Sequence, residues 1–368
     1  MKRFLTACAV AALALTASSA VPVADHSAAL AAAETGDLRI YWIDVEGGAS
    51  TLFVSPTGES LLFDTGNPGN GDRDAKRIFA TAQKAGLTKI DHVVISHWHG
   101  DHVGGLEALS KMIPLGKFYD HGDGVEAVDK ARHDAYVTLA GANRKMLKAG
   151  DTIGVGAIQF RVVVSEGPVI ANPINGGGPN PLCASAPQMN PAPPENIRMV
   201  GLAVTYNNFK FASLGDLDWT REMEMACPVN KLGHINLYTI NRHGGLDDSG
   251  NPALLGAIKP QVIVLNNGPR KGLGQTVKDA KPTNVNFTPY ETNSYLRLAK
   301  NPGIEGVWQE HLSMIDKDAA HNTAPDMIAN LDEGAADQGY GISAVVGKDG
   351  KFTITNARNG FSKTYTAH

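Results

Sequence analysis

Three histidines and an aspartate occupy six consecutive positions within the segment "SHWHGDH", residues 96–102. His97 and His99 alternate along a predicted extended segment, so both imidazoles can face one point, while Asp101 and His102 lie where the chain turns into a predicted helix. Imidazole nitrogens and carboxylate oxygens form a ligand set that suits zinc and is also accepted by manganese or iron. The residue types and their spacing therefore predict a metal site that is used for catalysis.

The element that must deliver this cluster is the apolar run "IDHVVIS", a short predicted buried strand. Before it, "LRIYWIDV", "STLFVSP" and "SLLFDTG" predict strands of a meander, and residues 72–87 have the apolar spacing of a helix that stops at a glycine. After it, residues 126–150 predict a single helix closed by Gly150, and helices and strands alternate. Strands that first meander and then alternate with helices favour sheets covered by helices within one domain.

Two later segments predict hairpins. "MVGLAVTYNNFKFASLGD" has an Asn-Asn turn between two β-rich runs, and residues 341–365 are predicted to turn from Lys348 to Gly350. The Pro/Gly/Asn-rich run that precedes the first of these predicts a long surface loop.

Composition sets the broad class of the protein. The chain has 368 residues, of which 43% are hydrophobic and 19% are charged, as in a loop-rich globular enzyme. The formal net charge of −4 argues against a dominant basic face that would capture a polyanion, although it does not exclude nucleic acid as a substrate.

The N-terminus has the layout of a secretory signal peptide. "MKRFLTACAVAALALTASSA" combines a basic start, an apolar run and small residues near its end. A membrane anchor is the alternative, but the run is shorter than the roughly 20 residues that span a bilayer. We therefore expect a signal peptide at residues 1–20, a leader at 21–36, a secreted or periplasmic location and no membrane span after cleavage. Cys183 and Cys227 then remain and can form one disulfide, but two cysteines establish no pairing.

The segment "SHWHGDHVGG" resembles the signature loop of the metallo-β-lactamase fold superfamily. This resemblance implies an α/β (α+β) fold, a four-layer αββα sandwich over residues 37–368, with a C-terminal elaboration from about residue 270. "FDTG", "SLGDLD" and "NRHGG" resemble further motifs of the family. By this resemblance, Asp64 contacts a ligand histidine and orients it without binding metal, Asp216 bridges two metals and His243 is the last ligand. The implied ligand set is His97 and His99 on one metal, Asp101, His102 and His243 on the other, and Asp216 between them, with Asp101 and His243 also assigned to catalysis.

A narrower resemblance is to the branch that contains the extracellular hydrolase domain of the competence DNA-uptake protein and its secreted stand-alone relatives. There "IDVGQGDS" opens the domain, where this chain has "IDVEGGAS", and "HHGS" supplies the last ligand, where this chain has "RHGG". Arg242 replaces one histidine of that pair, so only His243 can serve.

The chain departs from the family between His102 and Asp216, where many members contribute another histidine. Glu166, in "SEG", occupies about that place and is either a ligand of the first metal or an ordinary loop glutamate. His121, at a predicted strand end, is either a substrate contact on the rim of the site or a plain turn residue. Arg242 can bind an anionic substrate, although solvated surface charge is the more common role of such residues.

Three functions remain open. The first is a secreted metal-dependent hydrolase that uses a metal-activated water on phosphodiester bonds, which rests on the narrower resemblance. The second is hydrolysis of a lactam, lactone or thioester by the same centre, and the third is a degenerate metal-binding protein without activity. We expect one or two zinc ions, with manganese also acceptable, and a small-molecule or oligonucleotide substrate; no protein partner is indicated.

Overall fold

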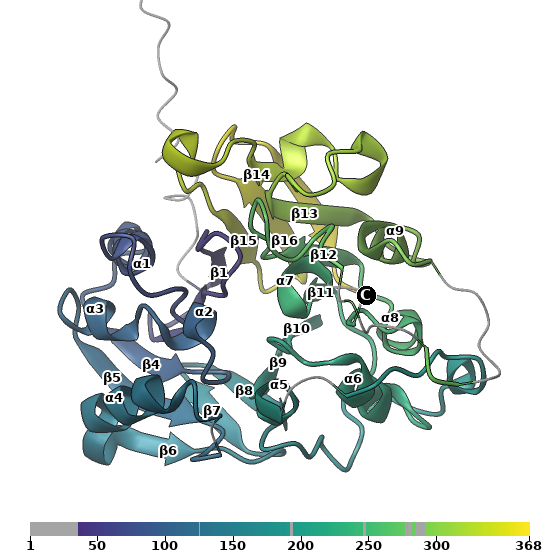
Figure 1. The fold of residues 1–368 in the computed structure, drawn as a ribbon, viewed down its shortest axis with the longest axis horizontal. Helices are drawn as coiled ribbons and strands as arrows, with labels where there is room; N and C mark the ends of the chain where they lie inside the picture. Colours follow the sequence, from purple (N-terminus) through teal and green to yellow (C-terminus); the bar gives the residue numbers. More distant parts are fainter. Residues whose placement is uncertain are drawn as a thin grey trace, which may run out of the picture. The chain divides into compact units, whose positions relative to one another are not determined.

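The computed structural model describes residues 36–124, 126–191, 194–245, 248–276, 278, 282–284 and 291–368, which form two β-sheets with helices on their outer faces (Figure 1). The predicted signal peptide and leader lie outside the described residues, apart from Gly36. Among the residues described, no helix has the length and apolar character needed to cross a membrane.

The first sheet has nine strands in the order β17-β16-β15-β1-β2-β3-β4-β5-β6. Its N-terminal half is the predicted meander followed by parallel strands, and three strands from the end of the chain extend it beside β1. The strands are β1 (Leu38–Trp42), β2 (Thr51–Val54), β3 (Ser60–Phe63), β4 (Ile90–Val94), β5 (Leu115–Asp120), β6 (Arg144–Met146), β15 (Ile342–Val346), β16 (Lys351–Asn356) and β17 (Ser362–Thr366).

The second sheet has eight strands in the order β14-β13-β12-β11-β10-β9-β8-β7. Each pair of neighbouring strands from β10 to β14 is parallel, whereas each pair from β7 to β10 is antiparallel. The strands are β7 (Thr152–Val155), β8 (Ile158–Val164), β9 (Gly201–Tyr206), β10 (Phe209–Ser213), β11 (Leu237–Thr239), β12 (Val262–Leu265), β13 (Gly306–His311) and β14 (Ile328–Asn330).

The inner faces of the two sheets share one hydrophobic core. Phe53 of β2 packs against Phe160 of β8 and Phe211 of β10, with ring centroids 5.0 and 5.3 Å apart. Every residue of β2 and β3 is buried, which requires cover on both faces of these strands. Helices provide the outer cover, so the strand runs of the sequence are apolar at consecutive positions.

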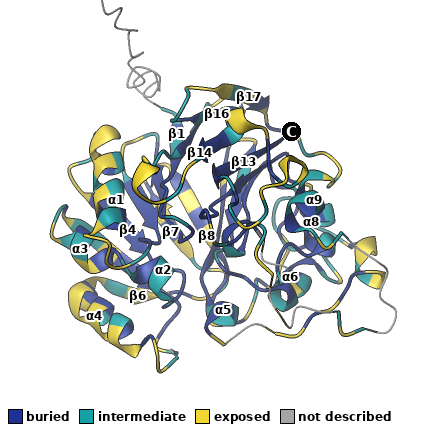
Figure 2. Cartoon of the chain, turned by 45° about the horizontal axis from the view of Figure 1, so that its top comes forward, coloured by how far each residue is buried: buried dark blue, intermediate teal, exposed yellow. Residues whose placement is uncertain are grey.

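Helices complete the four layers. In the views of Figure 1 and Figure 2, α1, α3 and α4 lie beside the first sheet, and apolar residues of α6, α8 and α9 pack in a core on the outer face of the second. The helices are α1 (Arg73–Lys84), α2 (Gly100–Val103), α3 (Leu106–Ser110), α4 (Lys130–Ala140), α5 (Pro194–Arg198), α6 (Trp219–Ala226), α7 (Arg242–Gly245), α8 (Pro252–Ile258) and α9 (Ser294–Ala299). The predicted αββα sandwich is confirmed.

Both predicted hairpins form, but one predicted helix is wrong. The Asn-Asn hairpin forms between β9 and β10, and the turn around residues 348–350 joins β15 to β16. The single helix predicted over residues 126–150 is wrong, because α4 ends at Ala140, just before Gly141 (φ 49°), and Arg144–Met146 pairs with β5 as an edge strand. The residues after about 270 add strands to both sheets.

A disulfide joins Cys183 to Cys227. It ties the long Pro/Gly-rich loop to the residue that follows α6, across a sequence separation of 44 residues. The pairing that the sequence left open is therefore formed.

Candidate metal centre

Two parallel strands bring Asp64 to the histidine segment. The strands β3 and β4 are parallel neighbours, so their carboxyl ends meet at one edge of the sheet. Asp64 follows β3, and Ser96 follows β4. The Ser96 backbone N–H donates to Asp64 Oδ1 at 2.6 Å and its hydroxyl donates to Oδ2 at 2.7 Å. Asp64 thus fixes the backbone from which His97 and His99 project.

The single turn of α2 then positions Asp101 and His102. The loop "EGGAS" packs against this turn, because the Ala49 N–H donates to the Asp101 carbonyl at 3.0 Å. A Cβ atom on Gly48 would lie 2.5 Å from the same carbonyl oxygen, so the close approach requires glycine. The loop that opens the domain therefore acts through the backbone of the metal-facing turn.

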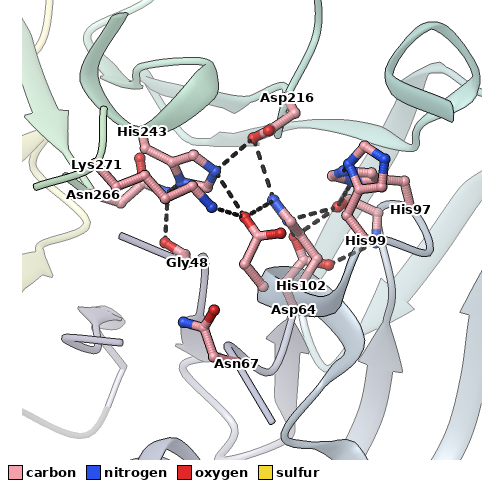
Figure 3. Close-up of polar contacts among 12 residues, drawn as sticks. Gly48, Asp64, Asn67, His97, His99, His102, Asp216, His243, Asn266 and Lys271 are labelled. Atoms are coloured by element: carbon pink, nitrogen blue, oxygen red, sulfur yellow. Dashed lines mark hydrogen bonds and ion pairs between the residues drawn. The ribbon is translucent and has the colours of Figure 1, made fainter. Parts of the chain in front are cut away.

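The second sheet also contributes residues from the carboxyl ends of parallel strands. The strands β10, β11 and β12 are parallel, and Asp216, His243 and Asn266 follow their carboxyl ends in that order. His243 lies in α7, a tight turn with left-handed φ angles at Arg242 (49°) and His243 (56°). In Figure 3, Asp216 and His243 face His102 across the gap between the sheets.

Four of these side chains converge on one point. The Nε2 atom of His102 lies 3.3 Å from Asp101 Oδ2 and 3.3 Å from Asp216 Oδ1. The Nε2 atom of His243 lies 3.1 and 3.3 Å from the same two oxygens. One potential ligand atom from each residue falls within 4.8 Å of all the others. This is the spacing of ligands around a shared cation.

The hydrogen bonding of the cluster fits a metal. Three buried atoms, His102 Nε2, His243 Nε2 and Asp216 Oδ1, have no hydrogen-bond partner among the described residues. Leaving such atoms unpaired in the interior is costly. Two imidazole nitrogens and two carboxylates match the nitrogen and oxygen ligands of zinc, so the residues present fit the ion that the sequence predicted.

Asp64 sets the orientation of His102. Its Oδ2 atom lies 2.8 Å from His102 Nδ1, and both side chains are buried. This contact leaves Nε2 as the nitrogen that faces Asp101 and Asp216. The arrangement is the carboxylate–histidine–metal pattern that fixes ligand geometry in metal sites.

His97 and His99 form a second pair beside the cluster. His97 Nε2 lies 3.0 Å from His99 Nδ1, and the His97 and His102 ring centroids are 4.0 Å apart. Two nitrogens that face each other at this distance, at the edge of a four-ligand cluster, can hold a second ion together with Asp216 (Figure 3). The other nitrogen of His99, Nε2, lies 4.0 Å from Asp129 Oδ2.

Charge in the cluster is tightly coupled. Burial lowers the pKa of His102, but the negative charges of Asp101, Asp216 and Asp64 outweigh it and hold this pKa well above the ordinary value. Burial raises the pKa of Asp101 and of Asp216, yet the neighbouring histidines hold both well below the usual carboxyl range. Burial and the charge of His102 keep the pKa of His97 well below its ordinary value. Two ionised carboxylates among buried ligand histidines therefore attract a cation.

Glu166 and His121 lie in a separate group. Glu166 Oε2 is 3.3 Å from His121 Nδ1, and Oε1 is 3.8 Å from Arg198. His121 also meets Glu195 at 2.9 Å, and its side chain is 0% exposed. Its ring nitrogens face the buried Glu195 and Glu166, whose side chain is 46% exposed, so the choice between a substrate contact and a plain turn residue stays a prediction. Glu166 belongs to none of the ligand clusters that the described residues form, so its role as a ligand stays a prediction.

Arg242 precedes the last ligand but points into an ion pair. Its Nε atom lies 3.2 Å from Asp248 Oδ1, and its side chain is 12% exposed. The side chain is thus held mainly within the protein, and its proposed contact with substrate also stays a prediction.

Two residues near the centre were not anticipated. Asn196 Nδ2 lies 3.4 Å from the Asp216 carbonyl and 3.5 Å from Oδ2, and Glu195 accepts the backbone N–H of Trp98 at 2.8 Å. Both belong to α5, which follows the long irregular loop. The sequence gives no signal that this loop returns to the histidine segment.

Comparison with known proteins finds a family that part of this chain resembles. Residues 43–180 match the model of the metallo-beta-lactamase superfamily. The chain is 31% identical over 109 residues to the Beta-lactamase-like protein 2 homolog of Caenorhabditis elegans, which covers 27% of this chain and 36% of that protein. It is 34% identical over 76 residues to the Atrochrysone carboxyl ACP thioesterase dmxR1 of Cryptosporiopsis sp. (strain 8999), which covers 20% of this chain and 23% of that one. The matched segments thus span about a quarter to a third of these relatives.

Among solved structures, the metallo-beta-lactamase fold protein YhfI from Bacillus subtilis superimposes with a TM-score of 0.43 at 13% identity, over 74% of this chain and 96% of that chain. The two packed sheets, the ligand cluster at their shared edge and the match of the family model over the segment that carries the first ligands agree with one another. Residues 43–180 of the chain are therefore similar to the metallo-beta-lactamase superfamily.

Proposed function

We propose that this protein is a metal-dependent hydrolase that cleaves an activated acyl bond, with a thioester as the leading substrate class and a lactone or lactam as close alternatives. The observation that carries the hydrolase assignment is the convergence of His102 and His243 Nε2 on the carboxylates of Asp101 and Asp216. The thioester is favoured because a relative that is 34% identical over 76 residues carries the name of a thioesterase.

The residues have distinct roles in this reaction. His97 and His99 would hold one ion and Asp101, His102 and His243 the other, with Asp216 between them. The chemistry that zinc would supply there is activation of a water for attack and polarisation of the acyl oxygen. Asp101 could orient the attacking water by accepting a hydrogen bond from it, because its carboxylate faces the centre while remaining 16% exposed. Hydrolysis forms a C–O bond, breaks the C–S bond and returns a proton to the leaving thiolate.

The test compares substrate classes on the zinc- or manganese-loaded protein. Turnover of a simple acyl thioester, an acyl lactone, a chromogenic cephalosporin and a chromogenic phosphodiester is measured for the wild type and His99→Ala. We expect the wild type to cleave the thioester. In His99→Ala the rate should fall by more than roughly 10–100-fold, which is the loss typical of a residue that only supports a ligand. His234→Ala is the matched control, since this histidine precedes β11 and its ring lies against that of His368, with centroids 5.2 Å apart, away from the carboxyl end of the strand. Metal binding without turnover of any substrate would instead support a metal-binding protein without activity.

Phosphodiester hydrolysis is the second candidate. It is supported by the resemblance of "IDVEGGAS" and "RHGG" to the branch of the competence DNA-uptake protein, and the same metal chemistry acts on phosphorus. Cleavage of the phosphodiester but not of the thioester would favour membership of that branch.

The location of the protein is proposed from its N-terminus. The basic start, apolar run and small residues of residues 1–20 support export and cleavage by a signal peptidase. Cell fractionation and N-terminal sequencing of the mature protein test this. A protein that retains Met1 in the cytoplasm would contradict it.

A further inference from the structure

We propose that Lys271 is a positioning and specificity-determining residue of the metal centre: its ammonium holds Asp101 until a metal ion takes that carboxylate, and then selects substrates with an anionic group beside the scissile bond. The part of this inference that concerns substrate rests on the proposed hydrolase function. The part that concerns the metal does not.

The contact itself is direct. Lys271 Nζ forms an ion pair with Asp101 Oδ2. The same oxygen lies 3.1 Å from His243 Nε2 and 3.3 Å from His102 Nε2. The ammonium therefore shares the carboxylate oxygen that faces two ligand nitrogens, and Figure 3 shows Lys271 beside His243.

The backbone of Lys271 is fixed against the centre. The loop after β12 makes a tight turn in which the Gly268 N–H donates to the Lys271 carbonyl at 2.9 Å. Two residues later, the Leu273 N–H donates to the His243 carbonyl at 3.2 Å, which ties the loop to the turn that carries the last ligand. On the other side, Asn267 Nδ2 donates to the His311 carbonyl at 2.7 Å.

Two glycines let this loop approach so closely. A Cβ atom on Gly272, which has φ 83°, would lie 1.6 Å from the His243 carbonyl oxygen. A Cβ atom on Gly268 would lie 2.4 Å from the carbonyl oxygen of Glu46, in the loop beneath α2. The position of Lys271 thus follows from close backbone packing on both metal-facing turns.

Arg270, the neighbouring basic residue, differs from Lys271 in its ion pair and in its exposure. Arg270 forms a bidentate ion pair with Glu333, both contacts being 2.7 Å, and its side chain is 66% exposed. Lys271 is 39% exposed, so its ammonium lies between the buried cluster and solvent. An ammonium at this boundary can meet a substrate that enters from solvent, whereas Arg270 faces elsewhere.

Two consequences follow from the charge. A divalent ion bound by Asp101, His102 and His243 would displace the ammonium and be repelled by it, so Lys271 weakens metal binding. Once displaced, the ammonium remains tethered at the rim of the centre. An anionic substituent on the substrate can then pair with it, and such charge-assisted contacts are strong and directional.

The first experiment measures zinc and manganese binding by isothermal titration calorimetry, so it needs no activity. The variants are Lys271→Met, Lys271→Arg and, as the matched control, Arg270→Met. We expect Lys271→Met to bind the first metal equivalent about tenfold more tightly, because a competing charge is removed. Lys271→Arg and Arg270→Met should stay near the wild type. Unchanged or weaker binding by Lys271→Met would overturn the metal part of the proposal.

The second experiment compares succinyl and butyryl thioesters, which have acyl chains of the same length but differ by one carboxylate. We expect Lys271→Met to raise KM for the succinyl thioester by about 10–100-fold, with a smaller change in kcat, and to leave the butyryl thioester within about twofold. Lys271→Arg should recover most of the lost affinity. Equal effects on both substrates would overturn the specificity role. If the wild type cleaves neither substrate, the proposed function fails, while the calorimetry still decides the metal part.

Discussion

Asp64 Oδ2 lies 2.8 Å from His102 Nδ1, and the same carboxylate holds the backbone N–H of Ser96. One buried side chain therefore orients a ligand histidine and fixes the segment that carries two more. We expect Asp64→Asn to weaken zinc binding by about 10–100-fold, because an amide orients and polarises the imidazole less well.

Zinc competition with a chromogenic chelator measures this affinity. Asp91→Asn is the matched control: its carboxylate also accepts from a serine N–H and hydroxyl, those of Ser60, but it contacts no ligand histidine. Equal affinities in the wild type and Asp64→Asn would show that the contact does not support the ligand.

The two halves of the centre should fill in order. Asp101, His102, Asp216 and His243 form a four-ligand cluster, whereas His97 belongs to no such cluster among the described residues. We expect the first zinc equivalent to bind at least about tenfold more tightly than the second. In His243→Ala the tight equivalent should be lost, while His97→Ala should retain it and lose the weaker one.

Elemental analysis after dialysis against graded chelator gives the stoichiometry of each variant, with circular dichroism as the check on folding. Loss of both equivalents in His97→Ala would contradict separate sites. Exhaustive chelation of the wild type should abolish hydrolysis, and returning zinc should restore it.

Metal binding should release a proton. The surrounding carboxylates outweigh burial and raise the pKa of His102, and the ion must displace its proton to reach Nε2. The apparent zinc affinity should therefore rise with pH, by up to about tenfold per unit, until the raised pKa is passed. Calorimetry at about pH 6 and 7 in buffers of different ionisation enthalpy measures the protons released. An affinity that is constant over this range would contradict the prediction.

The same proton affects the metal-free fold. Because the folded-state pKa of His102 is raised above about 6.5, the stability that its proton contributes is fully present below that value. This contribution is lost as pH rises through the raised pKa. Urea unfolding of the chelated protein should show a decline over that interval, and the decline should shrink in His102→Gln. Parallel declines in the two proteins would assign the effect to other groups.

The disulfide between Cys183 and Cys227 should stabilise the fold. It closes a loop with a sequence separation of 44 residues, and bridges over such loops contribute about 2–4 kcal/mol, chiefly by restricting the unfolded chain. We expect Cys183→Ser combined with Cys227→Ser to lower the free energy of unfolding by this amount, measured in urea. A reducing agent should destabilise the wild type equally and leave the double variant unchanged. A double variant as stable as the wild type would mean that the loop is already ordered without the bridge.

The sequence by itself determined the local features of this protein. Apolar runs and turn residues marked most strands, and "SHWHGDH" marked a metal site because its ligands are close in the chain. Such features depend on neighbours within a few residues, so they can be seen in a linear pattern. The motifs of Asp64, Asp216 and His243 could be placed only through their resemblance to a family.

The tertiary structure decided everything that depends on distant segments meeting. Periodicity could not show that residues 144–146 leave the predicted helix to form the edge strand β6, since that choice depends on pairing with β5. Spacing could not show that Glu166 turns towards His121 instead of the ligands, or that Asn196 returns beside Asp216. Lys271 reaches Asp101 across 170 positions only because two sheets place their strand ends at one edge. The donors of the centre come from loops on both sheets, and the packing of those sheets sets their distances.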